Sequence, residues 1–208
     1  MDIQCIIKIL KVNLRHNFVV HFALAVLITL FIPVVFSIRE LDADMAVRLV
    51  EMILPLMGIV IITPIFAPEH DKSIRDVVRS KKTNYILICS VRIIYSIFAA
   101  AIITFLFILL MKYSGSDVKI TYFVGGLINE IFLGALGVTA AGISGNICAG
   151  YMAPFFYYIL NVAGKEKMGY LYLFSMSAGS FEEKYYLFAL SVILIILTFI
   201  YVSRSEKH

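Results

Sequence analysis

Long apolar runs separated by short polar stretches set the hydrophobic pattern of this chain. Runs of about 18 or more apolar residues are the signature of helices that cross a membrane. Apolar and polar residues do not alternate with the period of a strand, so a transmembrane barrel is not expected. The pattern predicts an all-α polytopic membrane protein with six transmembrane helices. Their expected ranges are 18–38, 47–67, 85–111, two helices within 120–162, and 186–203.

A second pattern occupies residues 1–16, where apolar and polar positions repeat with helical spacing. A basic amphipathic helix of this kind lies in the membrane interface, with its cations toward anionic headgroups. The chain therefore divides into an interfacial amphipathic helix, residues 1–16, and a six-span transmembrane domain, residues 17–208. The apolar face is Ile3, Ile6, Ile7, Leu10 and Leu14, and the polar face is Gln4, Lys8, Lys11 and Arg15.

The connections between the late spans differ in kind. A short turn within residues 142–146 separates the fourth and fifth spans, whereas residues 164–184 separate the fifth and sixth. The middle of this longer stretch, residues 168–176, is apolar and aromatic but too short to cross a membrane. It predicts a re-entrant or interfacial element on the outer side, before the last span.

Polar residues and prolines modify the early spans. Glu51 is expected at the level of the headgroups, near the outer end of the second span. Pro55 and Pro64 are expected to kink this span. Arg92, near the start of the third span, is expected to reach back to the inner interface.

Composition and charge agree with a membrane protein. Of the 208 residues, 61 % are hydrophobic and 15 % are charged, whereas about 25 % charged is usual in globular domains. With the N-terminus inside, ten lysines and arginines fall on the cytoplasmic side and seven on the outer side. This bias predicts that both termini are cytoplasmic. The net charge of +4 is attributed to loop bias and headgroup contact. The sequence contains no basic patch with interleaved aromatic residues, so nucleic-acid binding is not predicted.

The most polar stretch between two spans is residues 68–84, PEHDKSIRDVVRSKKTN. Ile74, Val77 and Val78 recur at the spacing of one helical face, and charged residues fill the other face. A helix this short is not stable alone. The stretch is therefore predicted to be a cytoplasmic loop whose helix docks on a partner.

The motifs of membrane enzymes are missing or incomplete. No HExxH and no Walker A sequence occurs, and Cys5, Cys89 and Cys148 form no CxxC pair. The sequence therefore predicts no catalytic residue, no bound cofactor and no metal site. One enzymatic alternative stays open, a membrane cysteine peptidase with His70 as base and Cys89 as nucleophile.

Polar residues inside the spans are candidates for a substrate pathway, because polar groups are costly there. Glu130 is the one acidic residue predicted deep in a span, and Asn129 precedes it. Tyr157, Tyr158 and Asn161 are weaker candidates in the fifth span. A hydrogen bond between helices is the competing explanation for Glu130.

The residues PEHDKSIRDVVRSKKTNYILICSVRII, at 68–94, resemble the loop after the second span of the ABC type-2 permeases, the membrane subunits of many bacterial exporters. In that family the loop has a glutamate, a short helix, basic residues and a third span that opens with a basic residue. The family often has glycine and threonine after the glutamate, where this chain has residues 70–73, HDKS. The resemblance implies ATPase-coupling residues at Glu69, Ser73, Ile74, Arg75, Val77, Val78 and Arg79.

The resemblance also implies a function. A permease of this family moves a substrate outward, such as an amphipathic peptide, an antibiotic or a lipid, across the bacterial cytoplasmic membrane. ATP and Mg²⁺ bind to a separate ATPase subunit, and a second permease chain, identical or similar, completes the pathway. A third class, the substrate-binding membrane subunit of a vitamin importer, has about six spans but would not need the charged docking loop.

Overall fold

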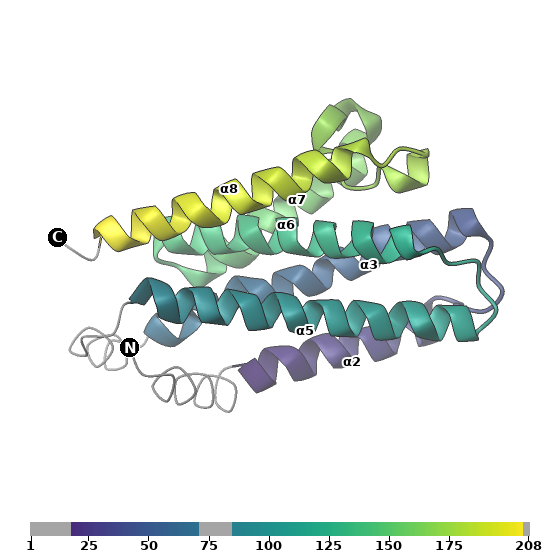
Figure 1. Cartoon of the computed structure of the whole chain (residues 1–208), viewed down its shortest axis with the longest axis horizontal. Helices are drawn as coiled ribbons and strands as arrows, with labels where there is room; N and C mark the ends of the chain where they lie inside the picture. Colours follow the sequence, from purple (N-terminus) through teal and green to yellow (C-terminus); the bar gives the residue numbers. More distant parts are fainter. Residues whose placement is uncertain (1–17, 71–84, 206–208) are drawn as a thin grey trace.

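The computed structural model describes residues 18–70 and 85–205, and all regular structure within them is helical (Figure 1). This confirms the predicted all-α class. The predicted interfacial helix, residues 1–16, and the coupling helix expected at residues 73–79 lie outside the described residues. In chain order the elements are α2 (Val19–Val35), α3 (Ala43–Ile62), η2 (Thr63–His70), α5 (Tyr85–Tyr113), α6 (Ile120–Ser144), α7 (Ile147–Gly164), η3 (Lys165–Leu171), η4 (Met176–Ala178) and α8 (Glu182–Ser205).

Helix α6 is the central element of the bundle. It contacts α3, α5, α7 and α8, while α2 packs on α3 and α5. Two glycines permit the closest approaches: a Cβ on Gly58 of α3 would lie 2.1 Å from the carbonyl oxygen of Glu130, and a Cβ on Gly137 of α6 would lie 2.8 Å from that of Gly150 on α7. Small residues at such crossings are typical of helices packed inside membranes.

Two connections meet at one end of the bundle, here called the connection end. The hydroxyl of Ser116, between α5 and α6, donates to the carbonyl of Ile38 at 2.7 Å. The same hydroxyl accepts the N–H of Leu41 at 3.1 Å. Hydrogen bonds therefore join the α2–α3 connection to the α5–α6 connection.

The predicted turn between the fourth and fifth spans is confirmed. Helix α6 ends at Ser144 and α7 begins at Ile147. Gly145 ends α6 with a φ of 63°, a conformation that glycine adopts without a steric penalty. This turn lies at the end of the bundle opposite the connection end (Figure 1), and η2, the start of α5 and the end of α8 also lie at this turn end.

Five helices in the described part of the chain are long and apolar enough to cross a membrane. Helix α2 is apolar but shorter, with 17 residues. Large apolar side chains are exposed on the outer faces, such as Leu30 and Phe98 with 66 % of their surface exposed. Apolar surface of this extent suits contact with acyl chains rather than with water. These features indicate a multi-pass membrane protein.

Two expectations about the polar residues of the spans are wrong. Helix α8 begins at Glu182, four residues before the expected start at 186, so Lys184 lies on a helix rather than in a connection. Glu51 is fully buried inside the bundle instead of lying among headgroups. The kink at Pro64 is confirmed by its non-helical ψ of 23°, whereas α3 continues through Pro55.

Candidate functional site

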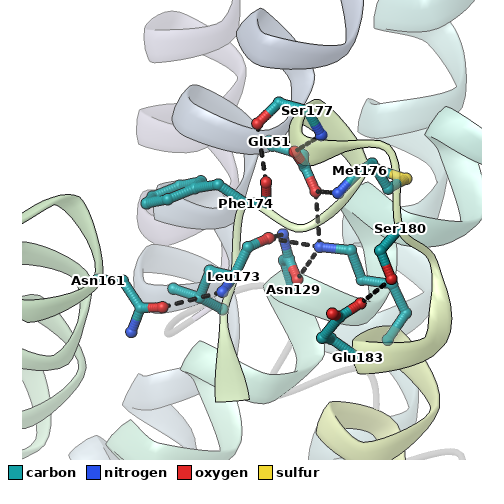
Figure 2. Close-up of polar contacts among 10 residues, drawn as sticks. Glu51, Asn129, Asn161, Leu173, Phe174, Met176, Ser177, Ser180 and Glu183 are labelled. Carbon is teal, nitrogen blue, oxygen red and sulfur yellow. Dashed lines mark hydrogen bonds and ion pairs between the residues drawn. The ribbon is translucent and has the colours of Figure 1, made fainter. Parts of the chain in front are cut away.

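Four polar side chains from four helices meet inside the bundle and are here called the polar cluster (Figure 2). They are Glu51 of α3, Asn129 of α6, Asn161 of α7 and Lys184 of α8, each with 0 % of its surface exposed. Glu51 is eight residues from the start of α3 and Asn129 is nine from the start of α6. At about 1.5 Å per residue, the polar cluster lies about 12 to 14 Å along these helices from the connection end.

An irregular segment between α7 and α8 reaches the polar cluster. It contains the short elements η3 and η4 and changes direction at Gly169 and Gly179, whose φ values are 56° and 87°. Positive φ values suit glycine because it has no Cβ. Figure 2 shows that Glu51, Asn129 and Asn161 point toward residues 173–177 of this segment, a turn that runs into η4 and is here called the inner turn.

The ammonium group of Lys184 is fully satisfied. Its Nζ lies 2.7 Å from Oε1 of Glu51 and donates to Oδ1 of Asn129 at 3.0 Å. It also donates to the carbonyl oxygen of Leu173. An ammonium group has three donors, and here each has an acceptor. This pairing explains how a lysine is buried, because a buried charge is costly unless it is paired and hydrogen-bonded.

The carboxylate of Glu51 binds the inner turn as well as Lys184. Its Oε1 accepts the N–H of Met176 at 2.9 Å, and its Oε2 accepts the N–H of Ser177 at 2.8 Å. Hydrogen bonds to an ionised group are shorter and stronger than those between neutral groups. Glu51 therefore joins α3 to both α8 and the inner turn.

The two asparagines bind a single residue of the inner turn. Nδ2 of Asn129 donates to the carbonyl oxygen of Leu173 at 2.8 Å, and Oδ1 of Asn161 accepts the N–H of Leu173 at 2.9 Å. Nδ2 of Asn161 also donates to the carbonyl oxygen of Tyr157, one turn earlier on α7, at 3.1 Å. Helices α6 and α7 thus bind both main-chain groups of Leu173.

The neighbouring tyrosines extend these contacts. The hydroxyl of Tyr157 donates to the carbonyl oxygen of Leu171 at 2.6 Å, and the hydroxyl of Tyr158 donates to that of Met52 on α3 at 2.7 Å. The first bond joins α7 to the chain just before the inner turn, and the second joins α7 to α3. Both tyrosines therefore act through main-chain carbonyl groups.

Glu130 lies apart from the polar cluster, although it follows Asn129 in the sequence. Its Oε1 accepts the hydroxyl of Thr104 on α5 at 2.5 Å, and its Oε2 has no hydrogen-bond partner among the described residues. The ring of Tyr158 also packs edge to face on that of Phe174, so four of the five residues predicted for a substrate pathway contact the irregular segment, whereas Glu130 lies at the contact of α6 with α5. The pathway itself stays a prediction.

Arg92 of α5 makes an internal contact near the turn end. Its Nη1 donates to the carbonyl oxygen of Ile65 in η2 at 2.8 Å, and 5 % of its surface is exposed. This bond joins the start of α5 to the end of the α3–η2 unit. The two elements that flank residues 71–84 are therefore tied to each other.

The described residues contain no group of three or more histidine, cysteine, aspartate or glutamate side chains arranged to hold a metal ion. Cys89 of α5 is buried, with 1 % of its surface exposed. The side chain of His70 lies outside the described residues. The chemistry that the polar cluster offers is therefore hydrogen bonding by a carboxylate, an ammonium group and two amides.

Sequence reasoning missed the pairing of Glu51 with Lys184. The two residues are 133 positions apart, and each was placed near a membrane surface by its distance from the end of an apolar run. One signal was present: Glu51 stands within a long apolar run, where an acidic residue needs a partner. That signal predicts a cationic partner but does not identify Lys184.

No protein-family model, no curated protein and no solved structure matches this chain. The function is therefore argued from the arrangement of its helices, its charges and its buried polar groups.

Proposed function

We propose that this protein is the transmembrane permease subunit of an ATP-binding cassette exporter in the bacterial cytoplasmic membrane. A separate ATPase subunit supplies the energy, and a second permease chain completes the pathway. The observation that carries the proposal is the charged stretch, residues 68–84, which begins in the last residues of η2 and precedes α5 in the sequence.

Six membrane crossings fit this proposal. Helix α2 has 17 residues, at the lower limit of the range of about 17 to 25 that crosses a bilayer. Counted with the five longer helices, it gives six crossings and places both ends of the chain on one side. The lysine and arginine bias makes that side the cytoplasm.

The irregular segment between α7 and α8 fits the proposal as a re-entrant element. Residues 173–177 contact the polar cluster about 12 to 14 Å inside the connection end, estimated from the helical rise. Irregular backbone is tolerated at membrane depth where protein groups bind its N–H and C=O groups. In the proposed orientation this element enters from the outer side and returns to it.

The contacts at the turn end suit the transmission of a push. In the proposed mechanism, ATP closes two ATPase subunits, and each pushes on the short helix within residues 73–79. The bond from Arg92 to Ile65 makes α3 and α5 receive this push together. Because Glu51 lies on α3, a movement of that helix also acts on the polar cluster.

Charge reversal tests the coupling. The double substitution Arg75→Glu and Arg79→Glu is expected to abolish co-purification of the ATPase and transport-coupled ATP hydrolysis. The reason is that two cations on the charged face of the predicted coupling helix become anions. Arg204→Glu, which reverses an exposed charge at the end of α8, is the matched control and should leave both unchanged. Unchanged coupling in the double variant, or complexes without any ATPase, would contradict the proposal.

The alternative function, a cysteine peptidase, predicts a different result at Cys89. Cys89→Ala should leave transport nearly unchanged, because a permease needs no thiol chemistry at this buried position, where 1 % of the residue's surface is exposed. A peptidase that used this thiol would lose all cleavage activity. Transport assays and peptide-cleavage assays on the same purified variant decide between the two functions.

A further inference from the structure

A groove between α2 and α5 opens on the outer surface of the bundle. Its volume is about 150 Å³, and six apolar side chains line it: Val26, Leu30, Ile103, Leu106, Phe107 and Leu110. Leu30 and Leu106 have 66 % and 58 % of their surfaces exposed, so the groove faces the surroundings of the protein rather than its core. In a multi-pass membrane protein, those surroundings are acyl chains.

The lining of the groove offers little to a polar ligand. Thr29 is the one polar residue that lines it among the described residues, and its hydroxyl already donates to the carbonyl oxygen of Ala25 at 2.8 Å, within α2. An engineered cavity of about 150 Å³, lined by leucine, isoleucine and phenylalanine, stays dry and binds benzene. The groove therefore suits a hydrocarbon rather than water or a polar solute.

The groove occupies the half of the bundle next to the connection end. Leu110 and Ile103 are three and ten residues before Tyr113, where α5 ends. At a rise of about 1.5 Å per residue, the groove extends from about 5 Å to about 15 Å below the end of α5. Half of a hydrocarbon core about 30 Å thick is about 15 Å. The depth of the groove therefore matches one leaflet of a bilayer.

Exposed tyrosines place the connection end at the level of lipid headgroups. Tyr113 ends α5 with 92 % of its surface exposed, and Tyr185, near the start of α8, is 68 % exposed. Helix α8 begins at the same end of the bundle at which α5 ends (Figure 1). Tyrosine is enriched at membrane–water interfaces, because its ring is apolar and its hydroxyl is polar. The groove therefore begins directly beneath the headgroup layer.

Charges of both signs lie at this end of the groove. Lys112, in the last turn of α5, is exposed two residues beyond Leu110. Glu40 is also exposed, and its main-chain N–H donates to the carbonyl oxygen of Ser114 at 3.1 Å, which holds Glu40 beside the end of α5. A zwitterionic headgroup, with a phosphate and an ammonium group, complements this pair of charges. Phosphatidylethanolamine has such a headgroup.

We infer that the groove between α2 and α5 is a binding site for one resident phospholipid, whose acyl chain lies along the groove and whose phosphate pairs with Lys112. A single acyl chain is thin enough to lie in a groove of this volume, whereas a helix of a second chain, about 10 to 12 Å across with its side chains, is not. The inference needs only that the chain spans a membrane. It is therefore independent of the ATPase and of the transported substrate.

Retention of phospholipid tests this inference. The full chain is reconstituted into vesicles of phosphatidylethanolamine and phosphatidylglycerol, extracted into mild detergent and analysed by native mass spectrometry. We expect one phosphatidylethanolamine molecule bound to each chain. Val26→Phe places a ring in the groove and should lower this occupancy at least about tenfold. Leu27→Phe, at an exposed position outside the groove, is the matched control and should leave the occupancy unchanged.

Tryptophan fluorescence supplies a second arm that does not depend on the folding of Val26→Phe, because the chain contains no tryptophan. Leu30→Trp places the fluorophore at the groove and Leu27→Trp places it outside, and the vesicles contain phosphatidylethanolamine with brominated acyl chains, which quench tryptophan. After extraction into detergent, quenching should persist at position 30 and disappear at position 27.

Three results would overturn the inference: no retained phospholipid, equal retention by the two phenylalanine variants, or equal fluorescence at the two tryptophan positions. Release of a second protein chain by Val26→Phe, in place of a lipid, would also overturn it, because a helix would then cover the groove.

Discussion

Lys184→Met is expected to destabilise the protein by about 3 to 5 kcal/mol, the usual cost of removing one partner of a buried ion pair. The carboxylate of Glu51 would remain buried with only two N–H donors, from Met176 and Ser177. The chain contains no tryptophan, so thermal unfolding is followed by circular dichroism of the helical signal in nanodiscs. The midpoint should fall steeply compared with the unchanged protein.

Two further variants isolate the cause of this loss. Lys167→Met removes an exposed lysine from the irregular segment between α7 and α8 and should leave the midpoint unchanged. Glu51→Gln combined with Lys184→Met removes both charges and should recover more than half of the lost stability, since no unpaired charge remains. A double variant as unstable as Lys184→Met alone would refute the ion pair as the source of stability.

Gly58→Ala is the second substitution with a large expected effect. The added methyl group would lie 2.1 Å from the carbonyl oxygen of Glu130 and 2.6 Å from its Cα, so α3 and α6 must move apart. Overpacking of a tight core costs about 1 to 3 kcal/mol and more where backbone must shift. We expect a cost at the top of this range, measured by the same thermal unfolding.

Gly164→Ala is the matched control for this substitution. There the nearest atoms belong to the flexible side chain of Met168, at 3.2 Å, and the backbone φ of −79° suits alanine. The change should have little effect on unfolding. Equal stability of the two variants would contradict the close helix approach at Gly58.

The sequence predicted the helices and the turn between α6 and α7 because hydropathy and turn chemistry act locally. Apolar runs required helices, since backbone groups must be satisfied within a membrane. Gly145 with its neighbours predicted a tight reversal, and the structure has one there. The kink at Pro64 follows from the same local rules.

The candidate site was predicted only in part, because it depends on contacts between distant residues. Asn129 and Asn161 were singled out as polar residues inside spans, but the contact that both make with Leu173 depends on how the chain folds back between α7 and α8. Glu51 and Lys184 looked like interfacial charges when considered singly. Their burial became explicable only as a pair, since each compensates the charge of the other.

Sidedness of the charged stretch tests the central claim most directly, because a permease driven by a cytoplasmic ATPase requires residues 68–84 inside the cell. Single cysteines are placed at Ser80 and at Ser37, which is exposed near the connection end, in a chain whose three cysteines are replaced by alanine. Intact cells are then treated with a thiol reagent that does not cross membranes. We predict labelling of the cysteine at 37 in intact cells and of the cysteine at 80 only after permeabilisation. Labelling of position 80 in intact cells would contradict the proposed function.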